Sequence, residues 1–249
     1  MNANGREFEK SAAVERFQRR LPPLLSVVAG MVDVIGYLGL KVFTAHVTGN
    51  LVLIAALVVR GGPPTLDEIM AVPVFVLAVA GVWLISKALN KRGAALAKPL
   101  LMIQFLLLVA VLAVAAVYDP AADPRGVMAD ITAAIVISAM ACQYSLLRLA
   151  MPVAPSTAVM TGNLTNAVLA FLDTMWRRRP LLKRAEERLR KTLQLLIGFF
   201  FGCMAGTAAI LWLGKWAWSF PVVLAGLAVV LAPRIAAAEP PKPLNHRGH

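Results

Sequence analysis

Hydrophobic residues occur in eight long runs that are separated by short polar segments. The runs cover, approximately, residues 22–40, 45–59, 69–89, 99–117, 127–150, 157–174, 192–213 and 216–233. A helix that crosses a bilayer needs about 20 apolar residues, and most of these runs are close to that length. The runs do not alternate between apolar and polar residues, as the strands of a membrane β-barrel do. The pattern therefore predicts an all-α, polytopic membrane protein.

Two of the eight runs are marginal for a full crossing, and both carry the same motif. Residues 45–59 are short, and residues 157–174 are interrupted by threonines and asparagines. The sequence TAHVTGNL begins at Thr44 and TAVMTGNL begins at Thr157, with six identities in eight positions. One apolar run precedes each motif and two follow it. We interpret residues 22–117 and 127–233 as two copies of one membrane unit, with tails at 1–21 and 234–249 and a loop at 118–126.

Composition supports the membrane interpretation and removes other classes of protein. The chain is 59% hydrophobic and 15% charged, and its net charge is +12. In a membrane protein such a charge indicates cytoplasmic loops rich in Lys and Arg, and no basic–aromatic module for nucleic acid accompanies it. Cys142 and Cys203 lie inside apolar runs, which predicts packing residues and no disulfide framework. Residues 1–21 are charged throughout, so we expect no cleavable signal peptide there.

The basic residues fall into four clusters. Their positions favour one of two possible numbers of membrane crossings. The clusters lie at 6–20, 87–98, 177–191 and 234–247, whereas the loops at 60–68 and 118–130 hold five carboxylates between them. If seven or eight runs cross fully, the cluster at 87–98 lies outside the cell. If each motif and its preceding run make one net crossing, all four clusters lie inside, as the positive-inside rule favours. We therefore prefer an inverted 3+3 repeat with a broken or re-entrant helix in each copy and both termini in the cytoplasm.

The Thr-Gly-Asn motif contains residues that suit a helix break inside the membrane. Glycine permits a turn, threonine can cap the helix that follows, and asparagine both donates and accepts hydrogen bonds. The six motif residues are Thr48, Gly49, Asn50, Thr161, Gly162 and Asn163. Two half-helix N-termini that meet near the midplane would form one site for an anion or a carboxylate. The alternative is that each motif caps an ordinary helix at the bilayer surface.

Polar groups deep within apolar runs are further candidates for the site. Asp33 is a carboxylate in VVAGMVDVIGYLG, and its cost in the membrane predicts either a role in ion or substrate contact or a structural hydrogen bond. Lys41 and Arg148 are the cations available to it. In the second copy Gln143 stands in the corresponding region, as a lining residue or an interhelical hydrogen bond. His46 is expected at the membrane surface, and proton sensing is the alternative.

Three glycines in GFFFGCMAG share one helix face at a spacing of four residues. They are Gly198, Gly202 and Gly206. This spacing predicts close helix packing, either inside the monomer or at a homodimer interface.

The two blocks AGMVDVIGYLGL…FTAHVTGNLVL and CQYSLLRL…STAVMTGNLTN resemble the YoaK-like family of uncharacterised bacterial membrane proteins. The residues that match are Gly30, Asp33, Phe43, Thr48, Gly49 and Asn50 in the first block, and Gln143, Thr161, Gly162 and Asn163 in the second. Tyr144 departs from the pattern, because that family usually has Asn there. The resemblance implies a bacterial inner-membrane protein of about six helices and brings no substrate with it.

The sequence is compatible with two functions. One is a small secondary transporter or facilitator of a solute or ion, with its site at the two breaks. The other is a membrane assembly factor, receptor or scaffold whose polar motifs lock helices together. We expect no enzyme, because the spacing of His, Cys, Ser and carboxylate residues matches no catalytic arrangement. We also expect no cofactor, no metal and no nucleic-acid partner, with the lipid bilayer as the main partner.

Overall fold

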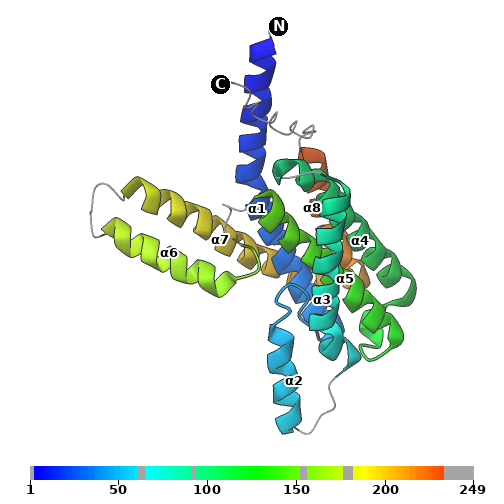
Figure 1. The fold of residues 1–249 in the computed structure, drawn as a ribbon. Helices are drawn as coiled ribbons and strands as arrows, with labels where there is room; N and C mark the ends of the chain where they lie inside the picture. The colour runs from blue at the N-terminus through cyan, green and yellow to red at the C-terminus, as the bar shows by residue number, and fades with distance from the viewer. Residues whose placement is uncertain (1–2, 61–64, 91–92, 152–155, 176–181, 233–249) are drawn as a thin grey trace, which may run out of the picture.

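The computed structural model describes residues 3–60, 65–90, 93–151, 156–175 and 182–232 (Figure 1). Within these residues the chain is entirely helical, with eight α-helices and three short 3-10 helices. The helices are α1 (Ala3–Leu40), α2 (Gly49–Arg60), α3 (Leu66–Ala88), η1 (Gly93–Leu96), α4 (Ala97–Tyr118), η2 (Pro120–Ala122), α5 (Val127–Ala150), α6 (Met160–Met175), α7 (Leu182–Leu213), η3 (Gly214–Trp218) and α8 (Ser219–Leu231). Each of the eight predicted runs corresponds to one α-helix.

The apolar character of these helices confirms a polytopic membrane protein. Five stretches of the described residues are long and apolar enough to cross a bilayer, and the last of them, Ala185–Leu231, contains most of α7 and all of η3 and α8. Large apolar side chains also cover the outside, such as Leu77 on α3, Trp212 on α7 and Val230 on α8. An exposed apolar surface of this extent is suited to contact with lipid.

Two core clusters define the two ends of the bundle. The upper core, at the middle of α1 and on the side of the N-terminus in Figure 1, includes Leu21, Leu100, Leu146 and Val229. The lower core includes Val32, Ala71, Val111, Val136 and Ala225.

These clusters give the direction of each helix. The helices α1 and α4 start at the upper core and run down, whereas α3, α5 and α8 finish there and run up. The helix α7 lies parallel to α1, because Gly198 faces Pro23 and Gly206 faces Met31. The first half therefore runs down, up and down, and the second half runs up, down and up.

Charge is distributed unequally between the two ends. Arg16 and Arg20 of α1 line a pocket with the end of α8, and Lys87 and Lys98 flank the junction of α3 and α4 at the same upper end. Carboxylates of the α3 and α5 starts and of the α4–α5 connection lie at the lower end: Asp67, Asp119, Asp123 and Asp130. This placement agrees with the topology in which the cluster at 87–98 shares a side with the N-terminal tail.

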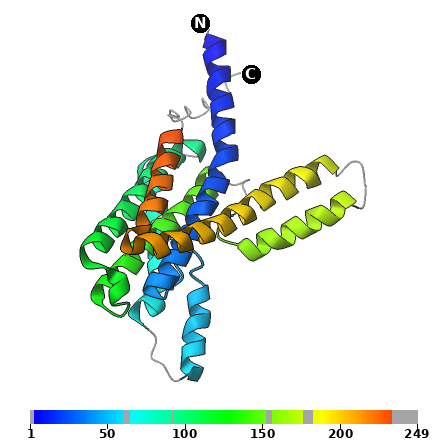
Figure 2. The same ribbon diagram turned by 180° about the vertical axis from the view of Figure 1, so that it is seen from behind.

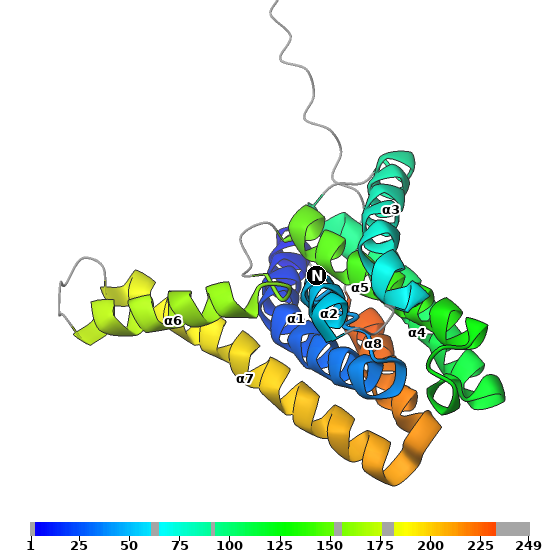
Figure 3. The ribbon, with the colours of Figure 1, turned by 90° about the horizontal axis from the view of Figure 1, so that it is seen from below.

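The helices α2 and α6 extend away from the bundle. In Figures 1 and 2, α2 projects below it, and α6 lies along the first part of α7 as an arm to one side. Figure 3 shows the same arm from below. The helices α2 and α6 have 12 and 16 residues, fewer than α1, α3, α4, α5 and α7, whereas α8 has 13. Both α2 and α6 begin at the two sequence motifs, beside the bundle, so each half has one short projecting helix in addition to three helices of the bundle.

The predicted glycine face packs inside the monomer, against α1. A Cβ atom on Gly202 would collide with the carbonyl oxygen of Val27, and one on Gly206 would lie 2.6 Å from Cγ1 of Val34. The close approach is reciprocal, because a Cβ on Gly30 would collide with the carbonyl of Phe199. Small residues on both helices thus let the backbones of α1 and α7 touch.

Candidate functional site at the two helix breaks

The first break is anchored on Asp33. After α1 ends at Leu40, the chain turns back along α1, so that residues 44–46 reach the level of Asp33. Oδ1 of Asp33 accepts hydrogen bonds from the backbone N–H groups of Thr44 (3.0 Å), Ala45 (2.9 Å) and His46 (3.3 Å). Three consecutive amides that point at one oxygen form an anion-binding nest. The anion in this nest is the protein's own carboxylate.

The second oxygen of Asp33 binds the side chain of His46. Oδ2 lies 2.7 Å from Nδ1, which is a hydrogen-bond distance. The Asp33 side chain is 7% exposed, whereas that of His46 is 30% exposed and stacks edge-on against Phe199 of α7. The imidazole thus connects a buried carboxylate to the surface of the bundle. The ring of His46 lies between Asp33 of α1 and Phe199 of α7.

Asn50 closes the first break at the start of α2. Its Oδ1 accepts from the N–H of Phe43, and its Nδ2 donates to the carbonyl of the same residue, both at 2.8 Å. Thr44 is fully buried and donates from its hydroxyl to the carbonyl of Val32 at 3.0 Å. The bonds of Asn50 satisfy the backbone N–H and carbonyl of Phe43, which lies outside any helix, and the bond of Thr44 ties this segment to α1.

The second break repeats part of this arrangement. Nδ2 of Asn163 donates to the carbonyl of Ser156 at 2.7 Å, seven residues back along the chain, and Asn50 spans the same separation to Phe43. The hydroxyl of Ser156 accepts from the N–H of Ala158 at 3.2 Å. Among the described residues no carboxylate occupies the position that Asp33 has at the first break. The two asparagines thus play equivalent roles, and the charge belongs to one break alone.

A buried amide pair connects the second break to the interior. Nε2 of Gln143 donates to the carbonyl of Leu25 at 3.0 Å and lies 3.5 Å from the hydroxyl of Thr157. Its Oε1 accepts from Nε2 of Gln104 at 2.7 Å. Gln104 and Gln143 are both fully buried, and Oε1 of Gln104 has no hydrogen-bond partner among the described residues. A polar network therefore joins α1, α4, α5 and the second break.

Neighbouring side chains of α5 contact both breaks. The hydroxyl of Tyr144 donates to the carbonyl of Ala45 in the first break at 2.8 Å. Gln143, the preceding residue, contacts Thr157 in the second break. One turn of α5 thus links two segments that lie more than a hundred residues apart in the chain.

The predicted site residues fall into two groups, one at each break. Asp33 and Asn50 hold residues 43–46, and Gln143 and Asn163 hold residues 156 and 157. These four side chains are buried.

The remaining motif residues lie at the edges of these groups. Thr48 and Thr161 are exposed, and Gly49 and Gly162 are half-buried. Thr161 lies within the first turn of α6, which begins at Met160, so the prediction that it caps this helix is wrong. The break is held by the asparagine, whose longer side chain reaches back to the preceding loop.

Two residues of the network were missed by sequence analysis. Gln104 is the one strongly polar side chain within the apolar run of α4, and a search for single amides in apolar runs would have found it. His46 was noted without its link to Asp33. Their separation of 13 residues matches no helical period, so the sequence pattern gives no signal for this contact.

Comparison with known protein families identifies one match. A family model described as protein of unknown function (DUF1275) matches residues 21–231, which include both breaks and all the spanning helices. Searches of curated proteins and of solved structures find no match. Since the match covers most of the chain and agrees with the YoaK-like resemblance, this protein belongs to the DUF1275 family of helical membrane proteins.

Proposed function

We propose that the protein is a transporter or facilitator of a small solute or ion, with its site at the two helix breaks. The observation that carries this proposal is the contact of Gln143 and Tyr144 with both breaks from one turn of α5. The reversed helix directions of the two halves support an inverted repeat. In inverted-repeat transporters, discontinuous helices from the two halves bind substrate and coupling ion between them.

Because only the first break holds a carboxylate among the described residues, the two breaks are suited to different roles. The amides of the first break are occupied by Asp33, so a substrate anion has no vacant nest there. The Asp33–His46 pair is instead suited to carry a proton, because a carboxylate and an imidazole lie 2.7 Å apart and the imidazole is 30% exposed. The second break, with Gln143 and Asn163, offers neutral amides for a polar solute. We therefore propose proton coupling at the first break and solute contact at the second, without a catalytic reaction.

The location that fits this function is the bacterial inner membrane, with both termini in the cytoplasm. The described basic residues of α1, α3 and α4 gather at the upper end, as the positive-inside rule favours for the cytoplasmic face. A reporter fused into the loop at 87–98 tests this orientation. A cytoplasmic signal is expected, and a periplasmic signal would reject the inverted repeat.

The functional test combines a ligand screen with a transport assay. The purified chain is screened by thermal shift at two pH values against inorganic anions, small carboxylates and neutral polar solutes. Uptake of each stabilising solute is then measured in proteoliposomes with and without a pH gradient. His46→Gln keeps a hydrogen-bond donor for Asp33 and removes the imidazole, so it should abolish the effect of the gradient while the melting temperature stays near wild type. Phe199→Leu, which removes only the ring contact, is the matched control.

One observation favours a non-transporting scaffold as the second candidate. The hydrogen bonds of Asp33, Asn50 and Asn163 go to the protein's own backbone, as in a purely structural lock. A scaffold predicts that no solute crosses the membrane and that every polar substitution at the breaks lowers stability. Uptake that is lost in a folded His46→Gln variant would reject it.

A further inference from the structure

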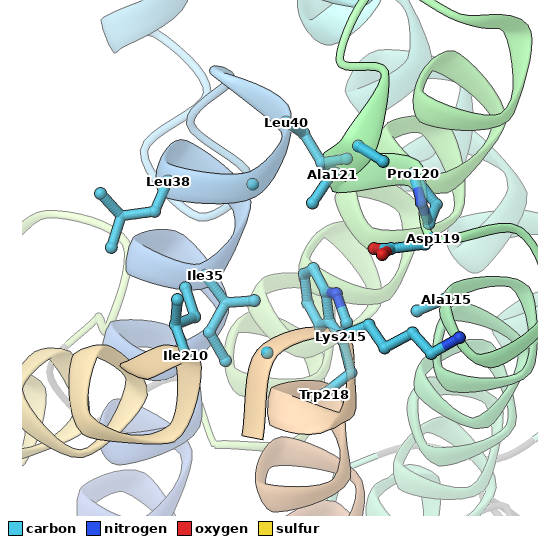
Figure 4. Close-up of a pocket in the computed structure, with 13 residues that line it drawn as sticks. Ile35, Leu38, Leu40, Ala115, Asp119, Pro120, Ala121, Ile210, Lys215 and Trp218 are labelled. Carbon is cyan, nitrogen blue, oxygen red and sulfur yellow. The ribbon is translucent and has the colours of Figure 1, made fainter. Parts of the chain in front are cut away.

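A cavity of about 330 Å³ lies at the lower end of the bundle, away from the two breaks. It forms where the last turns of α1, α4 and α7 converge with the 3-10 helices η2 and η3 (Figure 4). Ile35 and Leu38 of α1 and Ile210 of α7 provide apolar walls. Asp119, Lys215 and Trp218 provide its polar and aromatic groups.

Helix ends add partial negative charge beside this cavity. The last carbonyl groups of a helix lack partners within the helix, and its dipole places partial negative charge there. Three helices end beside the cavity, and each is followed by a residue with positive φ: Lys41 (63°), Asp119 (44°) and Gly214 (55°). Two ammonium groups of the protein already donate hydrogen bonds to carbonyl groups of this kind. Lys41 donates to the carbonyl of Leu38, and Lys215 donates to the carbonyl of Ala116 at 2.9 Å.

The carboxylate of Asp119 adds a full negative charge. In Figure 4 it points into the cavity, whereas the ammonium group of Lys215 points toward α4. Among the described residues the carboxylate has no ion-pair partner, because the bond of Lys215 to Ala116 holds that ammonium group elsewhere. A half-buried carboxylate without a cation leaves a place for a positive ligand.

The indole of Trp218 completes the site. It is 6% exposed and lies in Figure 4 between the apolar wall and the Asp119 carboxylate. A cation over an indole face is attracted by the ring, most strongly where water is excluded. An aromatic face, a carboxylate and helix carbonyls are together suited to an organic ammonium group.

We propose that this cavity binds an organic ammonium group attached to a small apolar body. The apolar walls fit the body, Trp218 and Asp119 bind the charge, and the volume lies at the small-molecule end of ligand pockets. The site lies at the end opposite to the basic upper end and is independent of the proposed transport site at the breaks.

Calorimetry with a matched pair of ligands tests the proposal. The full-length chain is purified in a maltoside detergent, without choline lipids, and titrated with choline and with 3,3-dimethylbutan-1-ol. The two have the same shape, and only choline carries the charge. Choline should bind at least about tenfold more tightly, as expected for a partly desolvated charge beside a carboxylate and an indole. Equal affinities, or no binding of choline at 10 mM (about the weakest binding the assay detects), would overturn the proposal.

Substitutions locate the binding to this cavity. Asp119→Asn should weaken choline binding about tenfold or more, and Asn tolerates the left-handed backbone, so the fold should be kept. Asp123→Asn, an exposed carboxylate of the same connection, should change nothing. Trp218→Phe should weaken binding about two- to fivefold, with Trp216→Phe of the same 3-10 helix as its control. If both Asp119→Asn and Trp218→Phe bind like wild type, the cavity is not the site.

The ammonium group could belong to a free molecule or to a lipid headgroup. Choline titrations in nanodiscs of phosphatidylglycerol, with and without phosphatidylethanolamine, separate these sources. If phosphatidylethanolamine competes with choline in the wild-type protein and this competition is lost in Asp119→Asn, the proposal is supported and the ligand is a lipid headgroup. If the affinity for choline is the same with and without phosphatidylethanolamine, the proposal is supported and the ligand is a free molecule. Competition that persists in Asp119→Asn would overturn it, because the lipid then acts elsewhere.

Discussion

The two breaks share a turn and differ in what holds it. At the first break a carboxylate gathers three backbone amides and an imidazole, and Asn50 adds a reciprocal pair of bonds. At the second, Asn163 makes one bond to the carbonyl of Ser156, and Gln143 approaches Thr157 at 3.5 Å. The shared asparagine bond shows that Thr-Gly-Asn specifies the turn. The charge of Asp33 is independent of this motif and, within the part of the chain that the structure describes, is present at the first break alone.

This difference has energetic consequences within a membrane. Hydrogen bonds to ionised groups are roughly twice as strong as neutral ones, but a buried carboxylate is costly unless it is fully partnered. The first break is therefore expected to be rigid, with a large loss of stability when its anchor is removed. The second should be the softer of the two, which suits a segment that contacts a solute.

The largest effect is expected from Asp33→Asn. An amide cannot accept from three N–H groups and an imidazole together, so unfolding in mixed detergent micelles should require about 3–5 kcal/mol less. Asp173→Asn, at an exposed carboxylate of α6, should stay within about 0.5 kcal/mol of wild type. A loss below about 1 kcal/mol for Asp33→Asn would remove the carboxylate as the anchor of the first break.

Gln143→Leu should come next, with a loss of about 2 kcal/mol. The substitution removes the bond to Leu25 and leaves the Gln104 amide buried without its partner. Since replacing both members of a buried pair is less costly than replacing one, Gln104→Leu/Gln143→Leu should recover part of the loss. The same unfolding assay measures all three proteins, and a double variant with the sum of both losses would contradict a coupled pair.

A direct comparison of the breaks is given by Asn50→Ala and Asn163→Ala. Asn50 makes two bonds to Phe43 and Asn163 makes one strong bond to Ser156, so we expect losses of about 1–2 and about 0.5–1 kcal/mol. Hydrogen exchange at the starts of α2 and α6 provides a local measure. Equal losses, or a larger one at Asn163, would mean that the charged break is not the more firmly held.

The smallest effect is expected from Tyr144→Phe. It removes a single hydrogen bond to Ala45, worth about 0.6 kcal/mol inside a membrane protein. Tyr37→Phe is the control, because Tyr37 stacks on Phe43 through its ring and is 39% exposed. A Tyr144→Phe protein as stable as Tyr37→Phe would show that the link from α5 to the first break is weak.

Much of the fold was predictable because it depends on apolar length. The run at 127–150 coincides with α5, and the short run at 45–59 becomes α2, which begins at Gly49. The cluster at 87–98 decided between two topologies, and Lys87 and Lys98 lie at the upper end with Arg16. Charge and hydropathy are properties of whole segments, so their effect on topology can be predicted from the sequence without knowledge of side-chain contacts.

The partners of individual side chains were not predictable. Asp33 binds backbone amides 11 to 13 residues later, and backbone groups leave no mark in a sequence. Lys41, one of the two cations available to Asp33 in the sequence, donates to the carbonyl of Leu38 instead. Asp119 and Lys215 lie in connections, and their relation to a cavity depends on how three helix ends meet.

The parallel contact of α1 with α7 has a consequence for biogenesis. Ser26 donates to the carbonyl of Leu195, a residue synthesised 169 positions later, and the glycine faces of the two helices meet along the same interface. The inner surface of α1, the first helix to enter the bilayer, is therefore covered only after α7, one of the last helices, has been inserted. Contacts of such long sequence separation form late and leave nascent chains open to misassembly. A ribosome that stalls before α7 leaves α1 in the lipid with its small-residue surface still uncovered.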